Sequence, residues 1–241
     1  MVILVTGATG TLGRPLLDEL RARGHDIRAL SRRPHEPQAG VTWHTGSLET
    51  GDGLAAAADG VDVIVHAASN TRRSGKGDVA ATANLLKVAG GAHFIFVSIV
   101  GVDRLPMPYY KVKLAAEQLV AREAKHWTIL RATQFHDLLR TFVDATPVVP
   151  VFARTKVQPV AAEDVALRVA DLAEGPPVQG RAPDLGGPEI RPMGDFFRAY
   201  LSSSGKHRLL LPVWLPGKLG RGLRAGYGNC PDHADGTVPF S

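Results

Sequence analysis

Tyr109 and Lys113 are the residues whose types and spacing are best suited to acid–base chemistry. They stand four positions apart in a stretch that predicts a helix, so their side chains share one face of it. A free phenol has a pKa near 10, and a neighbouring ammonium and the amino end of a helix both favour the phenolate. Lowering that pKa by ~3 units takes about 4 kcal/mol, which two nearby charges in a dry cleft can supply. The pair therefore predicts a general acid or base, with Ser98 at the end of a predicted strand as a third polar group.

A structural role is the alternative for this trio. Tyr109 follows Pro106-Met107-Pro108, and an aromatic residue at a helix start can simply cover the edge of a core. Tyr110 and Lys111 compete as candidates, although the spacing from Tyr110 to Lys113 is wrong for the pair.

A glycine-rich segment near residue 10 predicts a binding loop for a pyrophosphate. An apolar run predicts a buried strand, and three glycines at three-residue spacing follow it and open a helix. Such glycines permit a tight turn and close backbone approach, and the exposed amides of a helix start attract negative charge. An ordinary glycine-rich turn is the alternative. The residues expected at a bound dinucleotide are Gly7, Thr9, Gly10, Thr11, Leu12 and Gly13.

Short β-branched runs alternate with helical patterns over the first two thirds of the chain. This alternation predicts βαβ units and an α/β fold with a doubly wound parallel (Rossmann) sheet. The expected strands are residues 2–6, 26–31, 41–45, 61–66, 93–98 and 127–131, and the expected helices are residues 12–23, 54–58, 79–89 and 109–124.

After Phe135, prolines break the pattern into short pieces. Residues 157–160 predict a strand, and residues 162–172, 192–203 and 215–225 predict helices. We expect a single domain over residues 1–241, with residues 136–241 supplying most of a small substrate-side cap at the carboxyl edge of the sheet. Residues 231–241 show no periodicity and are expected to be mobile. The apolar residues 209–216 are interpreted as part of the core of the cap, with a substrate or partner contact as the alternative.

With its glycine spacing G-x-x-G-x-x-G, the chain resembles the short-chain dehydrogenase/reductase superfamily, in its extended and atypical NmrA-like branch. The resemblance extends to about Arg224. It rests also on His66-Ala67-Ala68-Ser69, Val97-Ser98-Ile99-Val100-Gly101, residues 109–117, residues 129–135, Val157-Gln158-Pro159-Val160 and Asp164-Val165-Ala166.

The resemblance implies Ser98, Tyr109 and Lys113 as the catalytic residues, because Ser-Tyr-Lys is the usual trio of the superfamily. In relatives of the isoflavone-reductase type the tyrosine is missing and the lysine alone serves. Only eleven positions separate Ser98 from Tyr109, fewer than is typical of the extended enzymes.

The resemblance also implies the residues that line a nicotinamide cofactor, with Lys113 on the nicotinamide ribose. Relatives have Gly-Asp-Leu after the third strand, where this chain has Gly46-Ser47-Leu48 and so lacks a carboxylate for the adenine amine. Beyond the glycine loop, the expected cofactor contacts are Ser31, Arg32, Arg33, Ser47, Leu48, His66, Ala67, Ala68, Lys113 and Thr133.

The end of the second strand indicates which dinucleotide is bound. An acid there would bind the ribose hydroxyls of NAD, whereas a basic residue accommodates the 2′-phosphate of NADP. The strand ends at Ser31-Arg32-Arg33, and its acid, Asp26, stands at the opposite end. Arginines supply charge-assisted hydrogen bonds to a phosphate, so we favour NADP(H) over NAD(H), with a plain solvated loop as the alternative.

Composition excludes several other classes. The chain has 241 residues, of which 44% are hydrophobic and 21% charged, which excludes disorder and a coiled coil. The net charge of +5 comes from scattered residues, so no nucleic-acid partner is expected. The single cysteine, Cys230, and the histidine spacing predict no disulfide and no metal site. Without a bilayer-length apolar run or a secretory leader, we expect a cytoplasmic location and no membrane partner.

These patterns predict an NADPH-dependent oxidoreductase that reduces a small apolar or aromatic carbonyl or enone by hydride transfer. The alternatives are an NADP(H)-sensing NmrA-like regulatory protein without turnover, and an epimerase or dehydratase that returns the hydride. Arg72, Arg73 and Lys76 stand in a loop expected over the cofactor site, which steers an anionic substrate, gates the cleft or is merely solvated. Phe135 and His136 are pocket candidates, His136 more often structural. A small-molecule substrate is expected, with the chain a monomer or homodimer.

Overall fold

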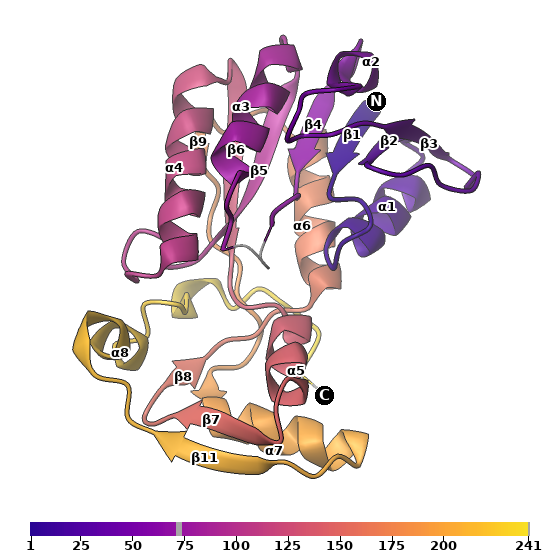
Figure 1. The fold of residues 1–241 in the computed structure, drawn as a ribbon. Helices are drawn as coiled ribbons and strands as arrows, with labels where there is room; N and C mark the ends of the chain where they lie inside the picture. The colour runs from indigo at the N-terminus through magenta and orange to yellow at the C-terminus, as the bar shows by residue number, and fades with distance from the viewer. Residues whose placement is uncertain (71–73, 241) are drawn as a thin grey trace.

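Seven parallel strands form the central sheet, in the order β3-β2-β1-β4-β5-β6-β9. The computed structural model shown in Figure 1 describes residues 1–70 and 74–240, so the predictions for Arg72 and Arg73 lie outside the described residues. The strands are β1 (Val2–Thr6), β2 (Asp26–Ser31), β3 (Val41–Thr45), β4 (Val63–His66), β5 (His93–Ile99), β6 (His126–Ala132) and β9 (Gly180–Arg181). The predicted doubly wound α/β fold is confirmed.

Helices cover both faces of this sheet, as a parallel sheet with buried strands requires. One face carries α1 (Gly13–Ala22) and α6 (Ala162–Glu174), whose apolar side chains join β1 in one core cluster. The other face carries α2 (Leu54–Ala58), α3 (Asp78–Val88) and α4 (Pro108–Glu123). Pro108 occupies the first turn of α4, where its fixed φ and missing N–H favour a helix start.

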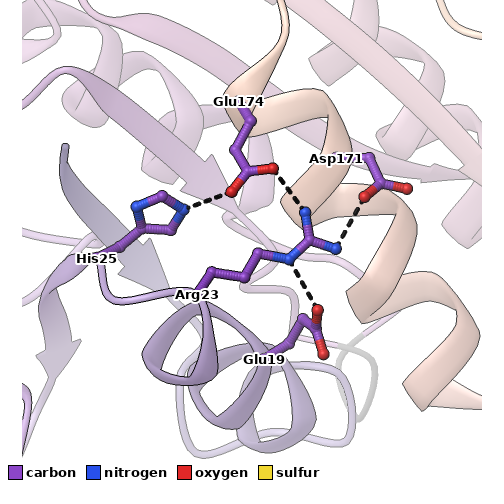
Figure 2. A network of polar contacts seen from close by, with 5 residues as sticks. All are labelled: Glu19, Arg23, His25, Asp171 and Glu174. Carbon is purple, nitrogen blue, oxygen red and sulfur yellow. Dashed lines mark hydrogen bonds and ion pairs between the residues drawn. The ribbon is translucent and has the colours of Figure 1, made fainter.

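Polar contacts fasten α6 to α1 at the end away from the glycine loop (Figure 2). The Arg23 guanidinium donates to Glu19, Asp171 and Glu174, each at 2.8 Å, and the ring of His25 lies 3.0 Å from Glu174. Burial alone would lower the pKa of Arg23, but the hydrogen bonds with the three carboxylates raise it above its ordinary value. The network therefore joins elements that are nearly 150 positions apart in the chain.

A second group of elements lies beyond the carboxyl ends of the strands, in the lower part of Figure 1. Its strands β7 and β11 pair in parallel, and β8 and β10 pair antiparallel, around a phenylalanine-rich core. The elements are α5 (His136–Asp144), β7 (Val148–Phe152), β8 (Lys156–Val157), β10 (Arg191–Pro192), α7 (Met193–Ser204), β11 (Leu209–Val213), α8 (Gly217–Arg224) and a 3-10 turn (Pro231–His233). Within the same stretch of sequence, α6 and β9 return to the central sheet.

The expectation of a mobile tail is wrong. The Asp164 carboxylate accepts hydrogen bonds from Thr237 N, at 3.0 Å, and Val238 N, at 3.1 Å, and from the Thr237 hydroxyl. Phe240 is buried, with its ring edge-on to those of His136 and Phe196. The tail is held by contacts that periodicity does not register.

The apolar stretch 209–216 is only partly core. Leu210 packs into the phenylalanine-rich cluster, whereas Leu209, Leu211 and Trp214 are 63%, 49% and 56% exposed. Strand alternation explains the exposure of Leu209 and Leu211, because successive side chains of β11 point to opposite faces, whereas Trp214 lies beyond the end of β11. Within the described residues, no helix combines the length and the apolar character that crossing a bilayer requires.

Candidate active site

The glycine loop between β1 and α1 has the shape that the sequence predicts. Gly7 adopts φ of +73°, and a Cβ there would lie 2.7 Å from the backbone nitrogen of Ala68. A Cβ on Gly13 would lie 2.1 Å from the carbonyl oxygen of Gly7, so neither position accepts a side chain. Gly10 donates its N–H to Gly7 O at 2.9 Å and closes the turn.

The start of α1 is suited to an anion. Its N-cap is Leu12, which has no polar side chain to satisfy the first amides of the helix. A groove of about 820 Å³ opens beside the loop, but Asp18, Glu19, Asp137 and Glu163 line it together with Thr9 and Thr11, so the groove itself does not suit an anion. In the first turn of α1, Arg14 donates its N–H to Gly10 O and Pro15 has no N–H. The Gly13 amide and the side-chain-free cradle of the loop fit the pyrophosphate of a dinucleotide.

The residues expected near the adenosine lie at the carboxyl end of β2. Arg32 and Arg33 are exposed, and neither forms an ion pair with a described carboxylate. The Ser31 hydroxyl lies 2.9 Å from His35 Nε2 and accepts a hydrogen bond from Arg33 N. Asp26 begins β2 beside Val2, at the opposite end of the sheet. The guanidiniums are therefore available to a phosphate, and the acid is not.

The neighbouring loop after β3 is held by its own hydrogen bonds. Ser47 donates its N–H to Asp52 O, and its hydroxyl accepts from Thr50 N. Leu48 is half-buried against the core under α2 and α3, so only part of this side chain is available for stacking on a base.

The side chain of His66 is hydrogen-bonded inside the protein. Its Nδ1 lies 2.7 Å from the Thr6 hydroxyl and its Nε2 lies 3.1 Å from the Thr82 hydroxyl. Because Thr82 donates to Asp78 O, it accepts from Nε2–H, and Nδ1 accepts from Thr6. Burial lowers the pKa of His66 to about 3, and the charge of Lys113 acts in the same direction. The imidazole is a neutral structural group, which leaves only the backbone of His66 for a nucleotide, as for Ala67 and Ala68.

Lys113 lies beneath the ends of β4 and β5, almost completely buried. Its ammonium donates to Val97 O at 2.9 Å and lies 4.3 Å from the centre of the Phe96 ring. Burial lowers the pKa of Lys113 to about 8, although the carboxylates of Asp78 and Glu117 oppose the shift.

Tyr109 points its hydroxyl at Ser69, with an oxygen–oxygen distance of 2.8 Å. Burial raises the pKa of Tyr109, the hydrogen bond with Ser69 lowers it, and the charge of Asp78 raises it further. The net shift is upward, so the expectation that groups of the chain stabilise the phenolate is wrong. Burial and the nearby Tyr109 raise the pKa of the competing Tyr110 to about 12.

Two buried hydroxyls at the same edge of the sheet have no hydrogen-bond partner within the described part of the chain. They belong to Ser98, near the end of β5, and to Thr133, directly after β6. Buried polar groups are normally paired, so an orphaned pair at this edge indicates a place for polar atoms of a ligand.

Sequence reasoning missed Ser69 and Asp78 as site residues. Asp78 is buried at the start of α3, accepts from the Ser69 hydroxyl at 2.5 Å, and accepts from Asn70 N at 2.9 Å. Ser69 closes the His66-Ala67-Ala68-Ser69 motif, which was the available signal.

A buried ion pair fixes the back of α4 to β6. The Arg131 guanidinium donates to both carboxylate oxygens of Glu117, at 2.9 Å and 2.7 Å, and approaches Asp103 at 3.1 Å. Burial would lower the pKa of Arg131, but its bonds with Glu117 and Asp103 raise it. This pair holds the helix that carries Tyr109 and Lys113.

His136 and Cys230 are both buried in the second group of elements. His136 is buried against Phe240, and burial lowers its pKa. Burial also raises the pKa of the Cys230 thiol to about 12, well away from a reactive thiolate. No group of three or more acidic, histidine or cysteine side chains in residues 1–70 and 74–240 is arranged to hold a metal ion.

The sheet order, the glycine cradle and the bare start of α1 define an NAD(P)-binding Rossmann protein. The chain belongs to the NAD(P)H-binding family, whose model matches residues 7–176, and this confirms the resemblance to the extended short-chain dehydrogenase/reductases. The family is of the NAD(P)-dependent oxidoreductase type.

The chain is similar to one curated relative in sequence and to two solved structures in fold. A chloroplastic divinyl chlorophyllide a 8-vinyl-reductase of Oryza sativa subsp. indica is 30% identical over 224 residues, which cover 77% of this chain and 54% of that protein. An NADPH-dependent quinone oxidoreductase of Escherichia coli, solved with NADPH, has a TM-score of 0.75 at 20% identity and covers 93% of this chain and 87% of that one. A nucleoside-diphosphate-sugar epimerase of Staphylococcus aureus has a TM-score of 0.74 at 21% identity, and the match covers 98% of this chain and 91% of that one.

These comparisons leave the cofactor preference open, because other matched structures contain NAD. The chain spans about half the length of the chlorophyllide reductases that it matches.

Proposed function

We propose that the protein is an NADPH-dependent oxidoreductase that reduces a small apolar or aromatic carbonyl or enone. The observation that carries the proposal is that Ser98, Tyr109 and Lys113 lie at the same carboxyl edge of the sheet as the glycine loop. When bound, the nicotinamide supplies the hydride. The reductases among the relatives support this choice of reaction class.

The residues of the chain have separable roles in this proposal. The amides of the glycine loop bind the pyrophosphate, and Lys113 holds the nicotinamide ribose. Ser98 and Thr133 offer hydroxyls to the substrate oxygen and the nicotinamide carboxamide. Tyr109 is the proton donor to the substrate oxygen.

The surroundings of Tyr109 favour an apolar substrate. Its ring belongs to a cluster that includes Met107 from the start of α4 and Leu219, Leu223 and Tyr227 from α8 and the segment after it. A substrate that reaches the phenol would therefore meet apolar side chains of the second group of elements.

A screen of quinones, ketones and enones with NADPH tests this function. We expect reduced-nicotinamide absorbance to fall with at least one member of the panel. Tight NADPH binding without oxidation by any compound would contradict the enzyme and support the sensor. Conversion of a sugar nucleotide without net loss of NADPH would support the epimerase or dehydratase, the class of the Staphylococcus aureus neighbour.

A substitution of Arg32 tests the proposed preference for NADP(H) over NAD(H). Arg32→Glu is expected to raise the KM for NADPH at least tenfold and to leave the KM for NADH within about twofold, because a charge-assisted bond to the 2′-phosphate contributes ~1.5–3 kcal/mol. Lys218→Glu, an exposed cation on α8, serves as the control for net charge. An unchanged ratio of the two KM values in Arg32→Glu would contradict the assignment.

A further inference from the structure

Ser69 and Asp78 form a hydrogen-bonded chain with Tyr109. The chain runs from Tyr109 Oη to Ser69 Oγ, 2.8 Å, and from Ser69 Oγ to Asp78 Oδ2, 2.5 Å. Asn70 N donates to the other carboxylate oxygen at 2.9 Å. The three side chains come from α4, the loop after β4 and the start of α3, so the fold brings them together from distant parts of the sequence.

The proton positions in this chain follow from donor chemistry. An ionised carboxylate only accepts, so the single hydroxyl proton of Ser69 points to Asp78. Ser69 therefore accepts from Tyr109, and the phenolic proton is directed along the chain, toward Asp78.

This arrangement opposes a free phenolate at Tyr109. Burial and the negative charge of Asp78 raise the pKa of Tyr109, and the Lys113 ammonium donates to Val97 O instead of to the phenol. A donor that ended its step as a phenolate would place a second negative charge near Asp78 in a buried setting.

We propose that Ser69 and Asp78 are positioning residues for Tyr109, with Ser69 relaying its proton to and from solvent and the Asp78 carboxylate orienting the Ser69 hydroxyl. The proposal rests on the proposed function. In the reductive direction the Tyr109 O–H bond breaks as the substrate oxygen takes its proton. The Ser69 proton moves to Tyr109, and a hydronium ion of the solvent gives a proton to Ser69 and leaves as water. Three O–H bonds break and three form, and Tyr109 and Ser69 return to their neutral forms.

The reverse direction uses the same groups. A substrate alcohol gives its proton to Tyr109 as its carbon gives up a hydride, Tyr109 passes its own proton to Ser69, and water receives the proton of Ser69. The charge of the Asp78 carboxylate raises the pKa of Lys113 on α4, whereas burial of that ammonium lowers it. Ser69 is exposed, so water can restore the proton balance of the chain after turnover.

Titration of the tyrosine tests the relay without a cofactor. The tyrosinate absorbance of each variant is measured against pH, and the contribution of Tyr109 is obtained by difference from Tyr109→Phe. Asp78→Asn is expected to lower the pKa of Tyr109, because it removes the carboxylate charge. Ser69→Ala is expected to raise it, because the Ser69 hydroxyl can rotate to donate to a phenolate and this stabilisation is lost. Asn70→Ala is the matched control, because Asn70 contributes only its backbone N–H to the chain.

Turnover provides the second measurement, with a substrate from the quinone, ketone and enone panel. Ser69→Ala and Asp78→Asn are each expected to lower kcat about 100-fold, as loss of general acid–base catalysis does, with KM for NADPH within twofold of wild type. Ser69→Thr, which keeps the hydroxyl, is expected to stay within fivefold. If Asp78→Asn fails to fold, Ser69→Ala still decides, since Ser69 is exposed.

The relay is overturned if Tyr109 titrates the same in Ser69→Ala, Asp78→Asn and wild type, or if Ser69→Ala keeps wild-type kcat. Failure of the proposed function looks different, because it would appear as wild-type protein that neither binds nor oxidises NADPH while the tyrosine titrations still shift in opposite directions.

Discussion

Replacing Lys113 by methionine is expected to stabilise the protein at neutral pH while removing most of its activity. The folded chain holds this ammonium almost fully buried, with one hydrogen bond, and burial lowers its pKa from 10.5 to about 8. At ~1.4 kcal/mol per pKa unit, keeping the charged form buried costs about 3 kcal/mol. A methionine of similar length fills the same space without that cost.

The contribution of Lys113 to the free energy of unfolding changes with pH in a definite direction. Below pH 8 the amine is charged in both states, and the folded protein bears the whole cost. Between pH 8 and 10.5 the unfolded chain holds more protons than the folded one, so wild-type stability rises with pH across this window. The Lys113 contribution to that rise should be absent in Lys113→Met. Urea unfolding at a series of pH values measures both effects.

The activity of Lys113→Met is expected to fall although its stability rises. Without the ammonium to hold the nicotinamide ribose, kcat/KM for NADPH is expected to fall about 10- to 100-fold, the effect of losing a hydrogen bond to a charged group. Lys111→Met, an exposed lysine on α4, is the control and should change neither stability nor kinetics. A Lys113→Met protein that is less stable than wild type at pH 7 would contradict the burial cost on which this prediction depends.

Removing Glu117 is expected to give the largest loss of stability. Glu117→Ala leaves Arg131 buried with only the half-exposed Asp103 as a partner, and breaking a buried pair from one side costs ~3–5 kcal/mol. The matched control is Glu123→Ala on the same helix, because Glu123 pairs with Arg122 in solvent and should contribute ~0–1 kcal/mol.

The double variant Glu117→Leu with Arg131→Met separates the cost of leaving Arg131 buried without its partner from the contribution of the ion pair itself. Removing both charges together should recover most of the stability, because apolar residues of similar volume often replace a buried pair without loss. Chemical unfolding of wild type, Glu117→Leu, Arg131→Met and the double variant completes a double-mutant cycle. Equal, small losses in Glu117→Ala and Glu123→Ala would show that the Arg131 pair is not the anchor of α4.

The sheet was predictable because its signals are local. Six strands and four helices follow from apolar runs, glycine turns and helical periodicity, and the strand ends differ from the expected ones by no more than two residues. The elements α5, β7, β9, β10 and β11 were missed. Pro150 lies inside β7 and Pro212 inside β11, and proline normally argues against a strand unless it lies at an edge. In a two-stranded sheet every strand is an edge.

The site was predictable only where its chemistry is local in sequence. The glycine loop, the Ser31-Arg32-Arg33 turn and the shared helix of Tyr109 and Lys113 can all be read from spacing. The hydrogen-bond partners of these groups cannot be read from spacing. Tyr109 binds Ser69, which precedes it by forty positions, and Lys113 turns its ammonium to a backbone carbonyl of β5. The spacing of Tyr109 and Lys113 thus places them on one helix but does not reveal Ser69 as the partner of the phenol.

The position of α6 has a consequence for biosynthesis. The apolar side of β1 and α1 is completed by Val165, Val169 and Ala173, which belong to α6 and follow the last long strand of the sheet, β6. A ribosome therefore delivers six strands of the central sheet and α1 before α6, which covers the same face as α1. Until α6 emerges from the exit tunnel, part of that apolar face stays uncovered, so this side of the sheet completes its folding late in translation.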